Sequence, residues 1–175
     1  MVIVEGSDNT GKTRLIEFLA CNSIGLKVIK SPGPQSAEFL ATWCLTMFKE
    51  DLIRPLIFDR FPVISEMVYG PMFRVRDVLQ EFGEGCFRDI LKDSQPLIIY
   101  CRPHIGKIMD LGDREQMKGV RENISILVDK YDYEIDLMRK EGFAIIEYDF
   151  NHRAFGKDEI LGLVRSHFER RGFRI

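Results

Sequence analysis

The sequence has few of the residues that commonly hold metal ions or crosslink a chain. It contains four cysteines, Cys21, Cys44, Cys86 and Cys101, and none of them forms a Cys-x-x-Cys pair. Only three histidines are present, and they lie far apart. A zinc site or a redox dithiol is therefore not expected. The cysteines lie in apolar stretches, which favours reduced, buried thiols of an intracellular protein.

Long apolar runs and strong net charge are also missing. No run approaches the roughly 20 residues that a membrane span needs. Met1 leads directly into an apolar stretch without a basic leader, so we expect a cytoplasmic protein without a membrane partner. The net charge of −2 does not favour a general nucleic-acid binder, although it leaves room for a local basic groove.

No internal repeat or Pro/Ser-rich linker interrupts the 175 residues, which predicts one domain over residues 1–175. Short apolar runs that resemble strands alternate with helical patterns. The strand-like runs are 2–4, 27–30, 56–58, 97–101 and 144–146, and the helical patterns are 13–19, 39–48, 63–91 with breaks, 120–140 and 157–171. This alternation predicts an α/β three-layer sandwich around a parallel five-stranded sheet.

Charged or glycine-rich residues follow four of the predicted strands. Gly6 follows the first strand, Lys30–Gly33 the second, Asp59–Arg60 the third and Arg102 the fourth. Because open α/β sheets bind ligands at the carboxyl ends of their strands, we expect these residues to converge on one edge. Their convergence is stronger evidence for a site than any one of them alone.

The segment after the first strand fits the P-loop pattern of P-loop NTPases. It reads Gly6-Ser7-Asp8-Asn9-Thr10-Gly11-Lys12-Thr13. Glycines let backbone N–H groups turn toward phosphate oxygens, and the following helix adds partial positive charge. Lys12 offers a charge to the β- and γ-phosphates, and the Thr13 hydroxyl is placed to ligate Mg²⁺. Residues Ser7 to Thr13 are thus predicted to bind ATP and Mg²⁺.

Asp59 and Arg60 are candidates for the chemistry itself. A carboxylate after a buried strand can hold Mg²⁺ or orient an acceptor oxygen, and an arginine can clamp a phosphate with two hydrogen bonds. A surface ion pair is the alternative. Lys30, beside Ser31, is a candidate for substrate binding on the same edge, with simple turn chemistry as its alternative.

A basic series runs through the polar stretch after the fourth strand. It comprises Arg102, Lys107, Arg114, Lys118 and Arg121. Such a segment, a lid over about residues 103–119, could close over phosphates and exclude water. The alternative is a solvated loop whose acidic residues balance its charge.

Aromatic residues follow the Asp-Arg pair. Phe61, Tyr69, Phe73 and Arg74 could sandwich a nucleobase and hydrogen-bond to it, and we take Phe61 and Arg74 as substrate-binding candidates. Core packing is the commoner fate of aromatic side chains.

Several of these segments resemble thymidylate kinases and their relatives among the P-loop nucleoside and nucleotide kinases. Glu5–Thr13 resembles their opening E-G-x-D-x-x-G-K, and Ser31-Pro32-Gly33 resembles their arginine-x-proline-glycine turn. Asp59-Arg60-Phe61 resembles their Asp-Arg-Tyr motif, and residues 110–118 lie where they carry the lid. The resemblance spans most of the chain, and the P-loop is its most specific part.

The resemblance implies an ATP-dependent kinase that phosphorylates a nucleoside monophosphate. Lys12 and Thr13 would hold ATP and Mg²⁺, Asp59 would lie near the metal and Arg60 near the acceptor phosphate. Some members place a catalytic arginine inside the P-loop, and others place arginines in the lid. Since Asn9 and Thr10 fill those P-loop positions, Arg114 is the natural catalytic candidate. Dimerisation is common in this family, so a homodimer is a further expectation.

The departures from the family leave the acceptor open. Lys30 replaces an arginine, Phe61 lacks a tyrosine hydroxyl, and Tyr100-Cys101-Arg102-Pro103 resembles the deoxynucleoside kinases. That last resemblance makes Arg102 a substrate-binding candidate. The alternatives are a deoxynucleoside, or a hydroxymethylated base within DNA, as in phage-type kinases. A third is a nucleotide-binding switch without kinase activity, although no Asn-Lys-x-Asp run for guanine recognition is evident.

Overall fold

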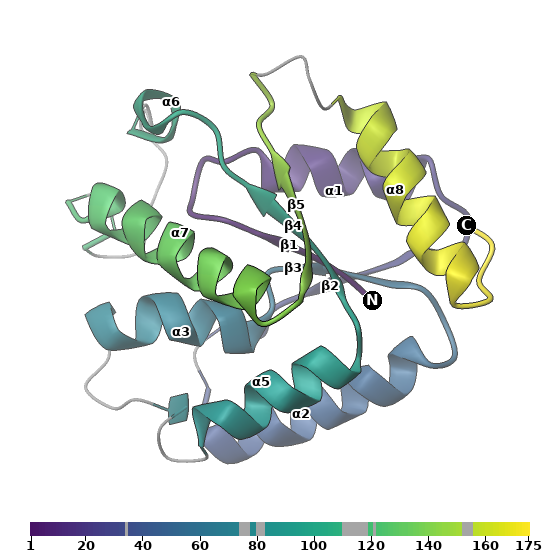
Figure 1. Ribbon diagram of the computed structural model, residues 1–175, viewed down its shortest axis with the longest axis horizontal. Helices are drawn as coiled ribbons and strands as arrows, with labels where there is room; N and C mark the ends of the chain where they lie inside the picture. Colours follow the sequence, from purple (N-terminus) through teal and green to yellow (C-terminus); the bar gives the residue numbers. More distant parts are fainter. Residues whose placement is uncertain (34, 74–77, 80–82, 110–118, 121, 152–155) are drawn as a thin grey trace.

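The computed structural model describes residues 1–33, 35–73, 78–79, 83–109, 119–120, 122–151 and 156–175 (Figure 1). The strands are β1 Val2–Glu5, β2 Lys27–Lys30, β3 Leu56–Asp59, β4 Leu97–Cys101 and β5 Ala144–Tyr148. The described helices are α1 Lys12–Cys21, α2 Ala37–Asp51, α3 Pro62–Phe73, α5 Glu84–Asp93, α6 Ile105–Met109, α7 Ile124–Lys140 and α8 Lys157–Arg170.

The sheet has five strands, all parallel, in the order β2-β3-β1-β4-β5. β1 occupies the centre, where Val4 pairs with Asp59 of β3 on one side and with Ile99 of β4 on the other. The predicted α/β architecture with a parallel five-stranded sheet is therefore confirmed. The loops that follow β1, β2, β3 and β4 leave the sheet at one edge, as expected for parallel strands.

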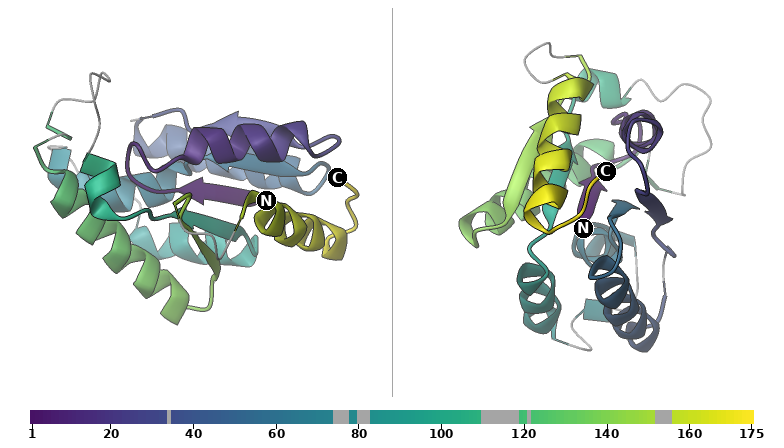
Figure 2. Two further views of the ribbon diagram at one scale, coloured as in Figure 1. Left: turned by 90° about the horizontal axis from the view of Figure 1, so that it is seen from above. Right: turned by 90° about the vertical axis from the view of Figure 1, so that its right-hand side faces the viewer.

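Helices cover both faces of the sheet and give the molecule its three layers (Figures 1 and 2). Val2 and Val4 are fully buried in a cluster shared with α1 and α8. Ile3, between them, faces the opposite side and joins a cluster shared with α2, α3, α5 and α7. The alternation of side chains along a strand thus explains why Val2, Ile3 and Val4 of the central strand are all apolar.

The element bounds differ from the sequence prediction in two informative places. The helix predicted from Val120 begins at Ile124, because Val120 is buried in the core from a turn that Asn123 closes by donating its backbone N–H to the Val120 carbonyl oxygen. A short helix, α6, also lies inside the segment predicted to form a lid over about residues 103–119, for which no helix was predicted. Apolar burial alone therefore does not mark where a helix starts.

Crossing a bilayer takes a helix of sufficient length and apolar character, and none within the described ranges has both.

Candidate active site

The P-loop begins with a glycine that the surrounding backbone requires. Gly6 has φ +140°, and a Cβ atom at this position would lie 2.5 Å from the carbonyl oxygen of Cys101. Gly11 has φ +82°, and its Cβ would lie 2.9 Å from the ring of Phe150. Both positions combine a left-handed or related backbone with close neighbours, so the two glycines of the motif are needed for the shape of the loop.

Lys12 lies folded inside this loop. Its Nζ donates hydrogen bonds to the carbonyl oxygens of Ser7 and Gly6, the latter at 2.9 Å, and the residue is only 7% exposed. Burial and the neighbouring charge of Arg60 lower the pKa of Lys12 to about 8. A buried ammonium group held by neutral carbonyls is well suited to meet an incoming anion.

Other P-loop side chains also fit a phosphate ligand. The Thr10 hydroxyl donates to the Ser7 carbonyl oxygen at 2.9 Å, which braces the turn. Ser7 Oγ is buried and makes no hydrogen bond within the described part of the chain. Thr13, in the first turn of α1, is exposed. A buried hydroxyl without a partner beside an ammonium group is the kind of donor that a phosphate oxygen would satisfy.

Asn9 connects the P-loop to α6, a contact that the P-loop motif does not predict. It has φ +61°, in the left-handed region that asparagine tolerates better than most residues. Its Nδ2 donates to the carbonyl oxygens of Lys107 at 2.9 Å and Ile108 at 3.4 Å, both in α6. Asn9 therefore tethers the P-loop to the helix that follows β4.

Arg60 occupies the junction between the P-loop and α3. One terminal nitrogen forms an ion pair with Asp8, and the other donates to the hydroxyls of Tyr69 at 2.8 Å and Tyr131 at 3.1 Å. Its backbone has φ +65°, and its N–H donates to the Val4 carbonyl oxygen at 3.0 Å. A non-glycine residue in this conformation needs surroundings that hold it there, and such residues cluster at functional sites.

Glu5 supports Arg60 from beneath the loop. The carboxylate is fully buried and accepts a hydrogen bond from the Phe61 N–H at 2.6 Å and another from the Tyr131 hydroxyl at 3.2 Å. Burial raises the pKa of Glu5, while the charge of Arg60 and these hydrogen bonds act in the opposite direction. Glu5 is visible in the sequence only as the first letter of the motif.

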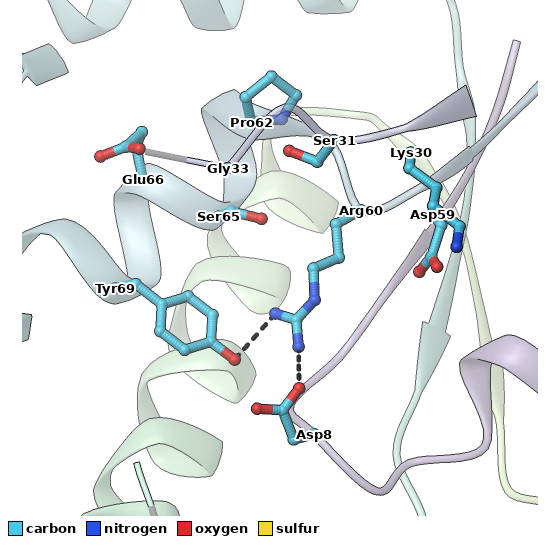
Figure 3. Close-up of a pocket in the computed structure, with 10 residues that line it drawn as sticks. All are labelled: Asp8, Lys30, Ser31, Gly33, Asp59, Arg60, Pro62, Ser65, Glu66 and Tyr69. Carbon is cyan, nitrogen blue, oxygen red and sulfur yellow. Dashed lines mark hydrogen bonds and ion pairs between the residues drawn. The ribbon is translucent and has the colours of Figure 1, made fainter. Parts of the chain in front are cut away.

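A cavity of about 340 Å³ opens beside the P-loop (Figure 3). It is lined by Asp8 of the loop, by residues after β2 and β3 and by one face of α3: Lys30, Ser31, Gly33, Asp59, Arg60, Pro62, Ser65, Glu66 and Tyr69. Its volume falls within the range of small-molecule sites. The expected convergence of the segments after β1, β2 and β3 is therefore observed at this cavity.

Ser65 and Glu66 are not among the site residues predicted from the sequence, and Tyr69 was predicted to contribute only its ring. With Pro62, these residues have the spacing i, i+3, i+4 and i+7, which places them on one face of α3. That spacing was readable in the sequence. The sequence did not show that this face borders a cavity. Most residues of α3 are apolar and buried, so the sequence pattern does not distinguish a face against the core from a face against a cavity.

Phe61 is placed differently from the prediction. Its side chain is fully buried and packs on Phe58 with ring centroids 5.3 Å apart, and on Trp43 at 5.7 Å. It therefore faces the core instead of the cavity, because burying an aromatic ring is strongly favourable. The part of Phe61 that serves the site is its backbone N–H, which Glu5 holds.

Arg102 also lies apart from the cavity lining. Its guanidinium forms a two-pronged ion pair with Asp132 of α7, at 2.8 Å through both Nε and a terminal nitrogen. Tyr100 donates to the same carboxylate at 2.7 Å. Arg102 thus fastens α7 to the end of β4, and a role in substrate binding stays a prediction.

Arg74 and Arg114 lie outside the described residues, so their predicted roles stay predictions. Asp59 lies at the end of β3 and lines the cavity, and Thr13 lies at the start of α1. Within the described ranges, no three His, Cys, Asp or Glu side chains gather as a metal cluster.

No protein-family model matches the sequence, and no curated protein matches it. Solved structures do match. YorR from Bacillus subtilis, in complex with phosphorylated GDP, has a TM-score of 0.67 at 21% identity, covering 96% of this chain and 95% of that one. Thymidylate kinase from Candida albicans has a TM-score of 0.57 at 15% identity, with coverages of 98% and 91%.

Deoxyadenosine kinase from M. mycoides, with dCMP and dCDP bound as products, has a TM-score of 0.58 at 15% identity, covering 97% of this chain and 98% of that one. These likenesses extend over nearly whole chains. The protein therefore has the fold of P-loop nucleoside and nucleotide kinases.

Proposed function

We propose that this protein transfers the γ-phosphoryl group of ATP to a small acceptor, a nucleoside monophosphate, bound in the cavity beside the P-loop. The observation that carries this proposal is the position of the cavity. It borders the P-loop directly, and Asp8 belongs to both. An acceptor there would lie next to the phosphates held by the loop, and bringing two reactants together is a large part of phosphoryl-transfer catalysis.

The side chains support distinct roles in such a transfer. Lys12 would bind the β- and γ-phosphates, and the Ser7 hydroxyl would donate to a phosphate oxygen. Thr13 and Asp59 would hold Mg²⁺, which supplies charge neutralisation when it is bound. An acceptor oxygen attacks the γ-phosphorus, the bond to the β–γ bridging oxygen breaks, and ADP leaves with that oxygen. Arg60 would orient the acceptor at the junction.

A second acceptor class is favoured by the charge of the cavity. Its described lining carries three carboxylates, from Asp8, Asp59 and Glu66, against two cations, Lys30 and Arg60. Arg60 already pairs with Asp8. Such a lining suits an uncharged nucleoside, which donates hydroxyl protons, at least as well as a phosphate. Asp59 would then accept the proton that the attacking hydroxyl loses.

The direct test is a screen with γ-labelled ATP and Mg²⁺ against free nucleosides, nucleoside monophosphates and duplex DNA containing hydroxymethylated bases. Lys12→Ala serves as the background, because it removes the charge that would bind the phosphates. We expect label transfer by the native chain to a monophosphate and none by Lys12→Ala. Transfer that is equal in both proteins, or ATP left unchanged with every acceptor, would refute the proposal.

Substitution of two lysines on the edge strand β2 distinguishes a monophosphate acceptor from a nucleoside acceptor. Lys30 lines the cavity, whereas Lys27 begins β2 and is equally exposed. For a monophosphate acceptor, Lys30→Gln is expected to raise the acceptor KM about tenfold while Lys27→Gln leaves it unchanged. For a nucleoside acceptor, both variants should keep the native KM.

A further inference from the structure

Tyr131 lies in α7, some 70 residues beyond the Asp-Arg motif, yet its hydroxyl reaches the motif directly. The side chain is fully buried. Its ring lies 6.0 Å from the Tyr100 ring in a stacked arrangement and 6.0 Å from the Tyr69 ring in an edge-on arrangement. The ring is thus held on two sides, and its hydroxyl has a fixed position at the junction of β1, β3 and α3.

The hydrogen bonds of this hydroxyl are directional. A phenol has one proton to donate and lone pairs with which to accept. The Tyr131 hydroxyl donates to Glu5 Oε2 at 3.2 Å and accepts from Arg60 at 3.1 Å. Since a carboxylate can only accept and a guanidinium can only donate, both bonds have a single sense. The Tyr131 hydroxyl therefore links the buried carboxylate of Glu5 to the guanidinium of Arg60 through two hydrogen bonds.

Glu5 holds the same motif a second time through the backbone. Its other oxygen accepts the N–H of Phe61, the residue that follows Arg60. The backbone of Arg60 is in the left-handed region, and the Glu5–Phe61 bond fixes the peptide that leaves it. Glu5 thus fixes the main chain directly and the side chain through Tyr131. Neither contact alone would set both the backbone and the guanidinium of Arg60.

We propose that Tyr131 is a positioning residue for Arg60: its hydroxyl, anchored on Glu5, fixes the guanidinium at the border between the P-loop and the acceptor cavity. The consequence for catalysis rests on the proposed phosphoryl transfer. Tyr131 does not line the cavity, so it acts through Arg60. The site is therefore completed by α7, a helix that contributes none of the recognised motifs.

A matched pair of substitutions isolates this hydroxyl. Tyr131→Phe keeps the ring and its stacking but removes the bonds to Glu5 and Arg60. Tyr100→Phe removes a hydroxyl from the other ring of the same stacked pair, and that hydroxyl donates to Asp132 instead. The two variants lose equivalent groups from neighbouring positions, and only one of those groups touches Arg60.

In steady-state assays with the acceptor found by the screen, Tyr131→Phe should lower kcat/KM for the acceptor about tenfold or more and leave the KM for ATP within about twofold, since bonds to charged groups are the stronger ones. Tyr100→Phe should stay within about twofold of the native chain on both. Equal behaviour of the two variants, or an effect confined to ATP, would overturn the proposal.

A second readout does not depend on turnover. In the native chain, the ¹⁵N–¹H heteronuclear NOE of Arg60 Nε should match that of the rigid backbone, whereas that of Arg14, which is exposed on α1, should be much lower. Tyr131→Phe should reduce the Arg60 value, and Tyr100→Phe should not. An Arg60 as mobile as Arg14 in the native chain overturns the proposal even if Tyr131→Phe fails to fold. If the chain transfers no phosphoryl group, this measurement still decides the positioning role.

Discussion

The P-loop and the acceptor cavity share Asp8, yet they are built in opposite ways. The loop is one continuous segment whose shape comes from backbone conformation, with glycines at φ +140° and +82° and a lysine folded onto carbonyl oxygens. The cavity is assembled by side chains from the P-loop, the ends of β2 and β3, and α3. Substitution of either loop glycine should therefore disrupt the P-loop. By contrast, substitution of a single side chain in the cavity should alter which ligand binds there without disrupting the backbone.

The sharpest test of this contrast compares one glycine from each region. Gly6→Ala would place a methyl group 2.5 Å from the Cys101 carbonyl oxygen at φ +140°, so the loop must move. We expect a loss of about 2–4 kcal/mol in the free energy of unfolding and a fall of at least about 100-fold in ATP affinity. Denaturant unfolding and calorimetric titration with ATP measure the two effects.

Gly33→Ala is the counterpart on the cavity side. Gly33 has φ +73°, but apart from its chain neighbours no described residue has a heavy atom within 4 Å of its Cβ position. Only backbone strain of about 1 kcal/mol is expected, with ATP affinity unchanged. If both variants bind ATP equally, the two regions do not differ in the way described.

The lowered pKa of Lys12 predicts an effect of about tenfold on ATP affinity as the pH changes. Because the triphosphate favours the charged amine, ATP affinity should fall about tenfold between pH 7 and pH 9, as Lys12 with its pKa of about 8 loses its proton. Titration calorimetry from pH 7 to 9.5 measures it. Lys12→Met should bind weakly without this step.

The same shift predicts an opposite trend for stability without nucleotide. The folded-state pKa of Lys12 is lowered from 10.5, so the unfolded chain binds more protons between about pH 8 and 10.5. The contribution of Lys12 to the free energy of unfolding should therefore rise with pH across this window. A comparison of native and Lys12→Met unfolding curves at pH 7.5 and 9.5 isolates it.

The smallest effect is expected at Asn9, whose side chain ties the P-loop to α6. Asn9→Gly keeps the left-handed backbone and removes the tether to α6, whereas Asn9→Ala removes the tether and adds strain of about 1 kcal/mol. Amide exchange at Gly106–Ile108 should be faster in both variants, and only Asn9→Ala should melt clearly lower. Unchanged exchange in α6 would show that the tether has no mechanical role.

Much of the fold could be read from the pattern of apolar runs. The five strand-like runs became the five strands. The three inner strands, β1, β3 and β4, are buried over nearly their whole length and therefore need apolar sequence, whereas the edge strands β2 and β5 are partly exposed. Val120 was wrongly assigned to a helix, since a residue can also be buried from a turn. No helix was predicted at α6, because five residues are too few to show a helical period. Phe61 was predicted to bind substrate because it follows Asp59 and Arg60. The sequence does not show whether such an aromatic side chain points into the core or toward a ligand.

The sequence by itself determined the triphosphate side: a P-loop is local, and its residues act through backbone geometry that eight consecutive positions specify. Tertiary structure alone decided the rest of the site. It brought Tyr131 to Glu5 and Arg60, placed Ser65, Glu66 and Tyr69 along a cavity, and turned Phe61 into the core. The physical reason is that these roles depend on which side chains packing brings within hydrogen-bond distance, and residues 5, 60 and 131 become neighbours only after the sheet and α7 have come together.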